Sequence, residues 1–185
     1  EIYDIMEANG LECIDATCPF VQKIQRIAAQ AEKEGAVLLV AGDKTHPEVQ
    51  GIVGHTRGEV FVFADLAELK AWKGPSDPQK PLFAVAQTTF QVTKWKESSE
   101  FLKKAYTNAR IFDTICNATW ARQQEAEDLS QQCDIIVVIG GHHSSNTQKL
   151  VQVAAKHTRA VTVETASELR PEWFADVKTA GVTAG

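Results

Sequence analysis

The sequence predicts an α/β protein made of two repeated units, each a small parallel sheet flanked by helices. Two observations lead to this prediction. Short apolar runs typical of parallel sheets, "AVLLVAG" at 36–42 and "DIIVVIG" at 134–140, alternate with helix-length segments. The same features also recur 98 positions apart. When the sequence is aligned with itself at this offset, Cys18 aligns with Cys116 and the two apolar runs coincide. We therefore expect a duplicated unit with right-handed crossovers.

The first unit is predicted to alternate strands with helices from residue 12 onward. "ECIDAT" at 12–17 is strand-like, and Pro19 then suits the first position of a helix, where its missing N–H is not needed. Apolar residues follow at helical spacing up to Gly35, which ends the helix. The remaining elements are strands at 36–42, 59–63 and 81–86 and helices at 47–54, 65–72 and 90–106.

The second unit is predicted to repeat this order. We expect strands at about 110–115, 134–139, 160–164 and 179–183, and helices at 118–131, 146–157 and 167–175. Residues 11–108 would form the first α/β unit and 109–185 the second, whose C-terminus we expect to be truncated. Residues 1–10 read as the tail of a helix from a missing upstream unit.

Composition limits the classes of function. The net charge of −5 argues against a general nucleic-acid surface or an anionic membrane surface. The longest apolar runs are too short to span a bilayer. Four cysteines at scattered spacings do not predict a disulfide framework, so a reducing cytoplasm is the expected location.

Two cysteines occupy equivalent points of the repeat. Cys18 and Cys116 each follow a predicted strand and precede a predicted helix, and ligands collect at that edge of an open α/β sheet. The positive end of a helix dipole favours a thiolate. Such a thiolate is a nucleophile, a redox thiol or a metal ligand, and the alternative is an inert buried cysteine.

Polar loops follow the second strand of each unit. "GDKTHPEVQG" offers His46 and Glu48. "GGHHSSNTQK" offers hydroxyls and an amide where a helix begins, a combination that suits phosphate but equally suits helix capping. "QTTF" at 87–90 adds further hydroxyls, including Thr88, although a polar turn explains it as well. Convergence of these loops at one point would favour a ligand site.

Several of these motifs together resemble one family. "DATCPFVQKI", "THPEVQG", "AQTTF", "DTICNATWARQ", "GGHHSSNTQKL" and "GVTAG" are similar to 4-hydroxy-3-methylbut-2-enyl diphosphate reductase, an iron–sulfur enzyme of the non-mevalonate isoprenoid pathway. The resemblance implies three α/β units with pseudo-threefold symmetry around a [4Fe–4S] cluster, of which this chain would supply the second and third. Cys18 and Cys116 would be two of the three cluster ligands.

The resemblance also implies a role for each site residue. Glu48 would deliver protons to the allylic hydroxyl, with Thr88 in the relay. The diphosphate would be held by His46, Ser144, Ser145 and Asn146. A ferredoxin- or flavodoxin-type partner would supply electrons, and the products would be isopentenyl and dimethylallyl diphosphate. We expect the fragment alone to lack the cluster and to be inactive.

Two alternatives from other classes stay open at this point. One is a non-catalytic α/β module that binds phosphate through residues 144–146. The other is a zinc hydrolase that uses Cys18, His46 and Cys116.

Overall fold

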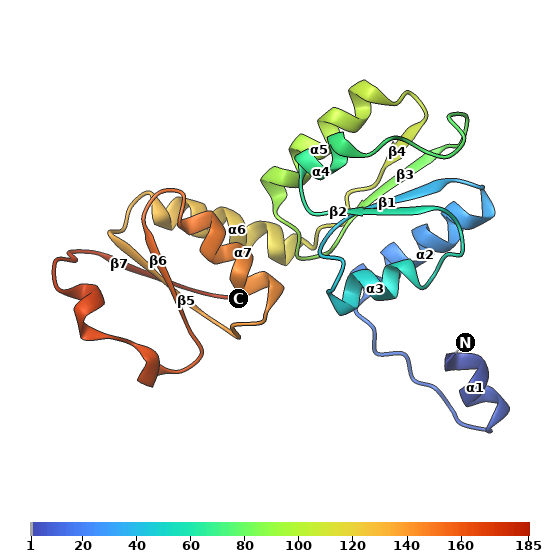
Figure 1. Cartoon of the computed structure of the whole chain (residues 1–185). Coiled ribbons are helices and arrows are strands. Elements are labelled where there is room, and N and C mark those ends of the chain that lie inside the picture. Colours follow the sequence, from blue (N-terminus) through green and yellow to red (C-terminus); the bar gives the residue numbers. More distant parts are fainter. Residues whose placement is uncertain (1) are drawn as a thin grey trace.

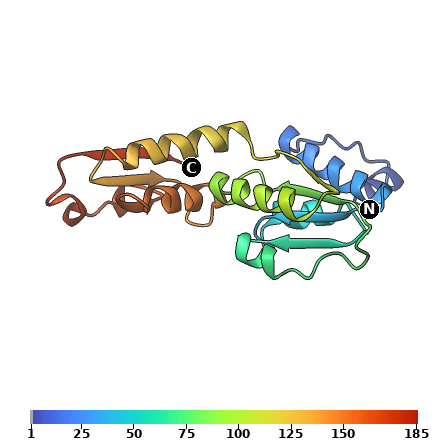
Figure 2. The same cartoon turned by 90° about the horizontal axis from the view of Figure 1, so that it is seen from above.

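The computed structural model describes residues 2–185, and in it two α/β units lie end to end (Figure 1 and, from above, Figure 2). The helices are α1 (Ile2–Ala8), α2 (Pro19–Lys33), α3 (Pro47–Val53), α4 (Leu66–Ala71), α5 (Val92–Ala105), α6 (Asn117–Ser130) and α7 (Ser145–Ala154). The strands are β1 (Val37–Ala41), β2 (Val60–Phe63), β3 (Leu82–Ala86), β4 (Ala109–Ile111), β5 (Ile135–Ile139), β6 (Arg159–Val163) and β7 (Ala180–Ala184).

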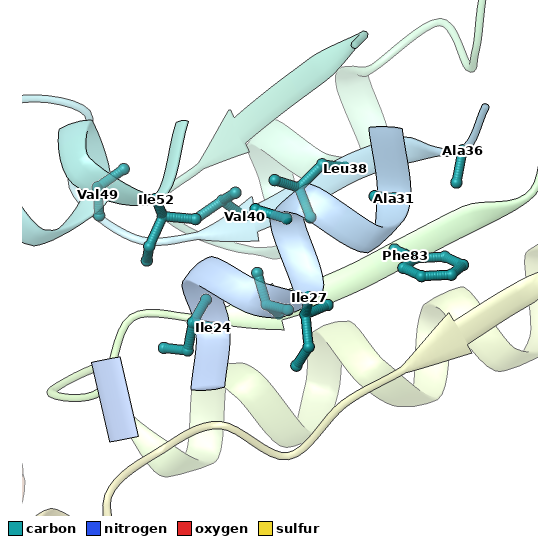
Figure 3. Packing of buried hydrophobic residues seen from close by; sticks show 11 residues of the cluster. Ile24, Ile27, Ala31, Ala36, Leu38, Val40, Val49, Ile52 and Phe83 are labelled. Atoms are coloured by element: carbon teal, nitrogen blue, oxygen red, sulfur yellow. The ribbon is translucent and has the colours of Figure 1, made fainter. Parts of the chain in front are cut away.

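The first sheet is parallel throughout, with strand order β2-β1-β3-β4. Every residue of β1 and β3 is buried, because helices cover both faces. Side chains alternate between the faces. Leu38, Val40 and Phe83 meet α2 and α3 on one face (Figure 3), whereas Val37 and Leu82 meet α4 and α5 on the other. The predicted parallel α/β architecture is confirmed for this unit.

The boundaries of α2 follow the predicted signals. Cys18 is the residue before the helix, Pro19 is its first residue, and Gly35 lies just beyond its end with a φ of +64°. The N–H of Ala36 donates to the carbonyl of Ala31 at 2.8 Å, and the Gly35 N–H donates to Glu32. These two bonds are the Schellman pattern that a glycine in the left-handed region permits.

The second sheet has the order β6-β5-β7 and is also parallel. Helices α6 and α7 cover one face, where Ile136 and Val138 are fully buried against Leu150. The other face is covered less well, since Ile139 is 43% exposed and Val182 is 59% exposed.

The strand predicted at 12–17 is wrong, because residues 11–18 are irregular and mostly exposed. Comparison with the second copy gives the physical reason. The segment of the second copy that corresponds to 12–17 does form a strand, β4, but β4 pairs with β3 of the preceding sheet, where Leu82 lies opposite Ala109. A strand needs a neighbouring edge, and among the described residues the segment at 12–17 has none. The predicted division at residue 108 therefore does not coincide with the boundary between the sheets.

The helix predicted at 167–175 is also wrong. Two short 3₁₀ helices, Ala166–Glu168 and Pro171–Phe174, take its place. Pro171 lacks an N–H and disfavours helical geometry at the residue before it, so one continuous helix cannot form.

The N-terminal helix α1 stands apart from both sheets (Figure 1). It agrees with the helical tail predicted for residues 1–10, except that Glu1 lies outside the described residues. Among residues 2–185, none of the helices has the length and apolar character required to cross a membrane.

A single carboxylate anchors the loop that leads into β7. Asp134 Oδ2 accepts hydrogen bonds from the N–H groups of Lys178 and Thr179, both at 2.9 Å, and from the Thr179 hydroxyl at 3.1 Å. These donors, first the Thr179 N–H, hold the pKa of Asp134 below its ordinary value. A carboxyl group with a lower pKa in the folded state stabilises the fold above its unfolded pKa of about 4. The contribution disappears as the pH falls through the folded-state pKa.

We therefore expect Asp134→Asn to lower the urea midpoint at pH 7, and the difference from the unaltered chain to shrink below about pH 4. Urea unfolding followed by circular dichroism at several pH values measures this difference. Asp176→Asn removes an exposed carboxylate from the same loop and serves as the control. An Asp134 effect that is equally large at pH 7 and pH 3 would contradict the assignment.

Candidate functional site

Glu48 and Thr88 are brought into direct contact from two loops at the carboxyl edge of the first sheet. Glu48 lies in the first turn of α3, after β1, and Thr88 follows β3. One carboxylate oxygen, Oε1, accepts the Thr88 N–H at 2.6 Å, and the other, Oε2, accepts the Thr88 hydroxyl at 2.7 Å. Thr88 is 7% exposed and Glu48 is half-buried, so the carboxylate is fixed in orientation while one side stays accessible.

His46 is the residue before α3. Its Nδ1 accepts the N–H of Glu48 at 3.2 Å, which caps the helix. Since Nδ1 accepts, a neutral His46 carries its hydrogen on Nε2. The ring is therefore left with a donor for any further partner.

Cys116 lies beside this pair. Beyond β4 the chain continues along the edge of β3, where the Thr114 hydroxyl bonds both the N–H and the carbonyl of Ala86. The Cys116 N–H then donates to the Thr88 carbonyl at 3.0 Å. Cys116 precedes α6 as Cys18 precedes α2, with nearly the same backbone angles. The predicted equivalence of the two cysteines therefore holds for their helix N-termini, whereas the strand predicted before Cys18 is not formed. Both thiols are free, and Cys18 is exposed.

The polar run at 144–146 forms the N-terminus of α7. Ser144 caps the helix, because its Oγ accepts the Thr147 N–H at 3.3 Å. The first helical N–H groups, of Ser145 and Asn146, have no intrahelical acceptor. Asn146 Oδ1 is buried without a hydrogen-bond partner. A ten-residue helix thus presents its positive end with hydroxyl donors around it, an arrangement that suits an anion.

A cleft of about 570 Å³ joins the two units at this point. His46 lies on its first-unit side, and Ser145 and Lys149 lie on the α7 side. Burial, then the positive charge of Lys94, lowers the pKa of Lys149, while Asp43 opposes this shift. No carboxylate among the described residues lies within ion-pair distance of the Lys149 ammonium group. The cleft therefore combines a helix N-terminus with an unpaired cation.

Three residues of this region have roles that the sequence did not predict. The run at 87–90 was interpreted either as a source of polar groups for the site or as a polar turn, and in the structure Gln87 and Thr89 both bond Ser145 across the junction. Lys149 was missed although it stands four positions after Ser145, so that both lie on one face of α7. Helical spacing could have identified the lysine, whereas the bonds between units leave no pattern in the sequence.

The alternative of a zinc site at Cys18, His46 and Cys116 has no support in the part of the chain that the structure describes. Among residues 2–185, no three side chains of histidine, cysteine, aspartate or glutamate form a group able to hold a metal ion. Cys18, His46 and Cys116 are therefore not gathered around one ion, and the His46 ring instead caps α3. Two free cysteines at helix N-termini do fit part of a thiolate ligand set for an iron–sulfur cluster, provided that further ligands come from elsewhere.

Known proteins resemble the chain over its whole length. The model of the LytB protein family matches residues 1–185. The 4-hydroxy-3-methylbut-2-enyl diphosphate reductases of Campylobacter hominis and Syntrophotalea carbinolica are 38% and 41% identical to it, over 98% and 100% of the chain. The chain covers only 65% and 66% of those two relatives.

Solved structures agree with this assignment. The E-1-hydroxy-2-methyl-but-2-enyl-4-diphosphate reductase of Plasmodium falciparum superposes on 100% of the chain with a TM-score of 0.90 and 27% identity, and the chain covers 58% of it. A structure of (E)-4-hydroxy-3-methyl-but-2-enyl diphosphate reductase, 34% identical, matches with a TM-score of 0.57 and is covered to 66%. On the match of the whole chain to the family model, supported by these relatives, the chain belongs to the LytB protein family.

Proposed function

We propose that these two units belong to an oxidoreductase that converts 4-hydroxy-3-methylbut-2-enyl diphosphate to isopentenyl and dimethylallyl diphosphate. The observation that carries the proposal is the hydrogen-bonded Glu48–Thr88 pair beside the backbone of Cys116. The pair places the carboxyl group of Glu48, which can carry a proton, close to Cys116, the residue that the family resemblance implies as a cluster ligand. The names of the relatives support the same activity.

The diphosphate would bind between the units. His46 Nε2–H and the hydroxyls of Ser144 and Ser145 would donate to its oxygens, and Asn146 would add its amide. The positive end of the α7 dipole favours the same charge. Lys149 would add a favourable field at the wall of the cleft. These donors would fix the end of the substrate that does not react, and so orient the hydroxyl end.

Glu48 would serve as the proton donor. Removal of an allylic hydroxyl as water consumes two electrons and two protons, and the C–O bond is replaced by a C–H bond. The Thr88 hydroxyl donates to Glu48 Oε2, so it can pass a proton between the carboxyl group and the substrate oxygen. The Thr88 N–H on the other oxygen keeps the carboxyl group in one orientation during this transfer.

Cys18 and Cys116 would hold a [4Fe–4S] cluster together with a third ligand that these residues do not supply. When bound, the cluster would act as Lewis acid and electron conduit for the hydroxyl group. The electrons would come from a ferredoxin- or flavodoxin-type protein in a reducing cytoplasm. We propose that the 185-residue chain alone is inactive, since one thiolate ligand is lacking.

Iron and sulfide analysis of the full-length protein after anaerobic reconstitution tests this function. We expect about four irons and four sulfides per protein, and substantial loss of both in Cys18→Ala and Cys116→Ala. Cys13→Ala, which removes an exposed thiol near Cys18, is the control and should retain the cluster. Inorganic diphosphate binding without iron or sulfide would contradict the reductase and favour the phosphate-binding module.

A further inference from the structure

Ser145 receives two hydrogen bonds from the other unit. The Thr89 hydroxyl donates to Ser145 Oγ at 2.9 Å, and Gln87 Nε2 donates to the same oxygen at 3.4 Å. Gln87 Nε2 also donates to Thr89 Oγ1 at 3.1 Å, so the three side chains form a closed triangle. Thr89 and Gln87 follow β3, whereas Ser145 begins α7.

The orientation of the Gln87 amide is fixed by the backbone. Its Oε1 accepts the Asp43 N–H at 3.3 Å, a bond that only the oxygen can accept. Gln87 is 1% exposed, so the amide has little freedom to turn over and exchange its oxygen with its nitrogen. The NH₂ group must therefore face Thr89 and Ser145.

This arrangement determines what Ser145 can offer to a ligand. A hydroxyl group has two acceptor lone pairs and one donor hydrogen. Thr89 and Gln87 occupy both acceptor positions, so the Ser145 O–H is left to donate. A diphosphate oxygen at neutral pH requires a hydrogen-bond donor. A hydroxyl group that is already held as a donor has a smaller free-energy cost of reorientation when the anion binds.

We propose that Gln87 and Thr89 are positioning residues, which polarise Ser145 as a hydrogen-bond donor and thereby set the affinity of the cleft for diphosphate. The inference rests on the proposed function, because it takes Ser145 to be a diphosphate ligand. It adds that the first unit completes an anion site whose helix belongs to the second. Neither positioning residue has to touch the ligand.

The test is isothermal titration of the 185-residue chain with inorganic diphosphate. Thr89→Val keeps the shape of the side chain and removes the donor, and we expect it to weaken binding about tenfold. Thr89→Ser restores the donor and should bind within about twofold of the unaltered chain. Gln87→Leu should weaken binding at least as much as Thr89→Val, because it removes two donors. In Thr158→Val, one hydroxyl bond is lost far from the cleft, and binding should not change.

The outcomes separate the two proposals. Failure of the unaltered chain to bind diphosphate would overturn the diphosphate site and this inference together. Binding by the unaltered chain that Thr89→Val leaves intact would overturn the inference alone. Rescue by serine is the decisive readout, since a role in packing would depend on the valine-like methyl group that serine lacks.

Discussion

Glu48→Gln in the full-length protein is expected to lower turnover about 10²–10⁴-fold, the usual cost of losing a general acid, while the iron content stays unchanged. The amide can keep its oxygen toward the Thr88 N–H and place its NH₂ against the Thr88 hydroxyl, so the local structure persists. It carries no proton that it can transfer at neutral pH. Reduction of substrate with a viologen mediator under anaerobic conditions measures the effect.

Glu32→Gln is the matched control for this substitution. Glu32 also accepts a backbone N–H, from Arg57 at 2.9 Å, but it lies at the end of α2 away from the cleft. Its turnover should equal that of the unaltered protein. If Glu48→Gln retained near-normal turnover with a full complement of iron, Glu48 would be removed from the proton path.

Gly140→Ala is expected to destabilise the second unit by about 2–4 kcal/mol. Gly140 follows β5 and has a φ of +155°, which L-residues with a side chain rarely adopt. A Cβ at this position would lie 2.3 Å from Thr147 Oγ1 and 2.9 Å from the Gly185 carbonyl. Thr147 is completely buried, so it cannot move aside without displacing the start of α7.

Urea unfolding measures the stability loss, and Gly141→Ala provides the comparison at the next position. There an added Cβ would have its closest contacts at 3.7 and 3.9 Å, which are ordinary van der Waals distances. We expect Gly141→Ala to change stability by less than about 1 kcal/mol. Similar losses in the two variants would mean that the close approach at Gly140 does not constrain the fold.

Most of the fold could be predicted because its signals are local. The buried runs that became β1 and β5, the proline that opens α2 and the glycine that ends it act within a few residues of chain. The errors fall where a segment depends on something distant. Residues 12–17 have strand-like composition, but a strand requires an edge to pair with. Composition alone could not show that β4 pairs with the preceding sheet.

The residues of the candidate site also fall into those that local motifs predicted and those whose roles depend on distant partners. Glu48, Thr88 and Cys116 were predicted by motif, and the structure brings them together at one sheet edge. The roles of Gln87 and Thr89 were not predicted, because their partner Ser145 lies more than fifty positions away. A hydrogen bond between units depends on how the units are placed, and no periodicity in the sequence encodes that placement.

The pairing of β4 shows that the repeated segment of the sequence and the folded sheet do not have the same boundaries. By sequence, β4 opens the second copy, yet its hydrogen bonds are made in the first sheet. The second copy therefore completes the sheet of the first. A polypeptide divided at the copy boundary would leave β3 with a bare edge, whereas one divided after Ile111 would keep the first sheet whole. The two copies are thus interlocked through one shared sheet and are not two independent modules.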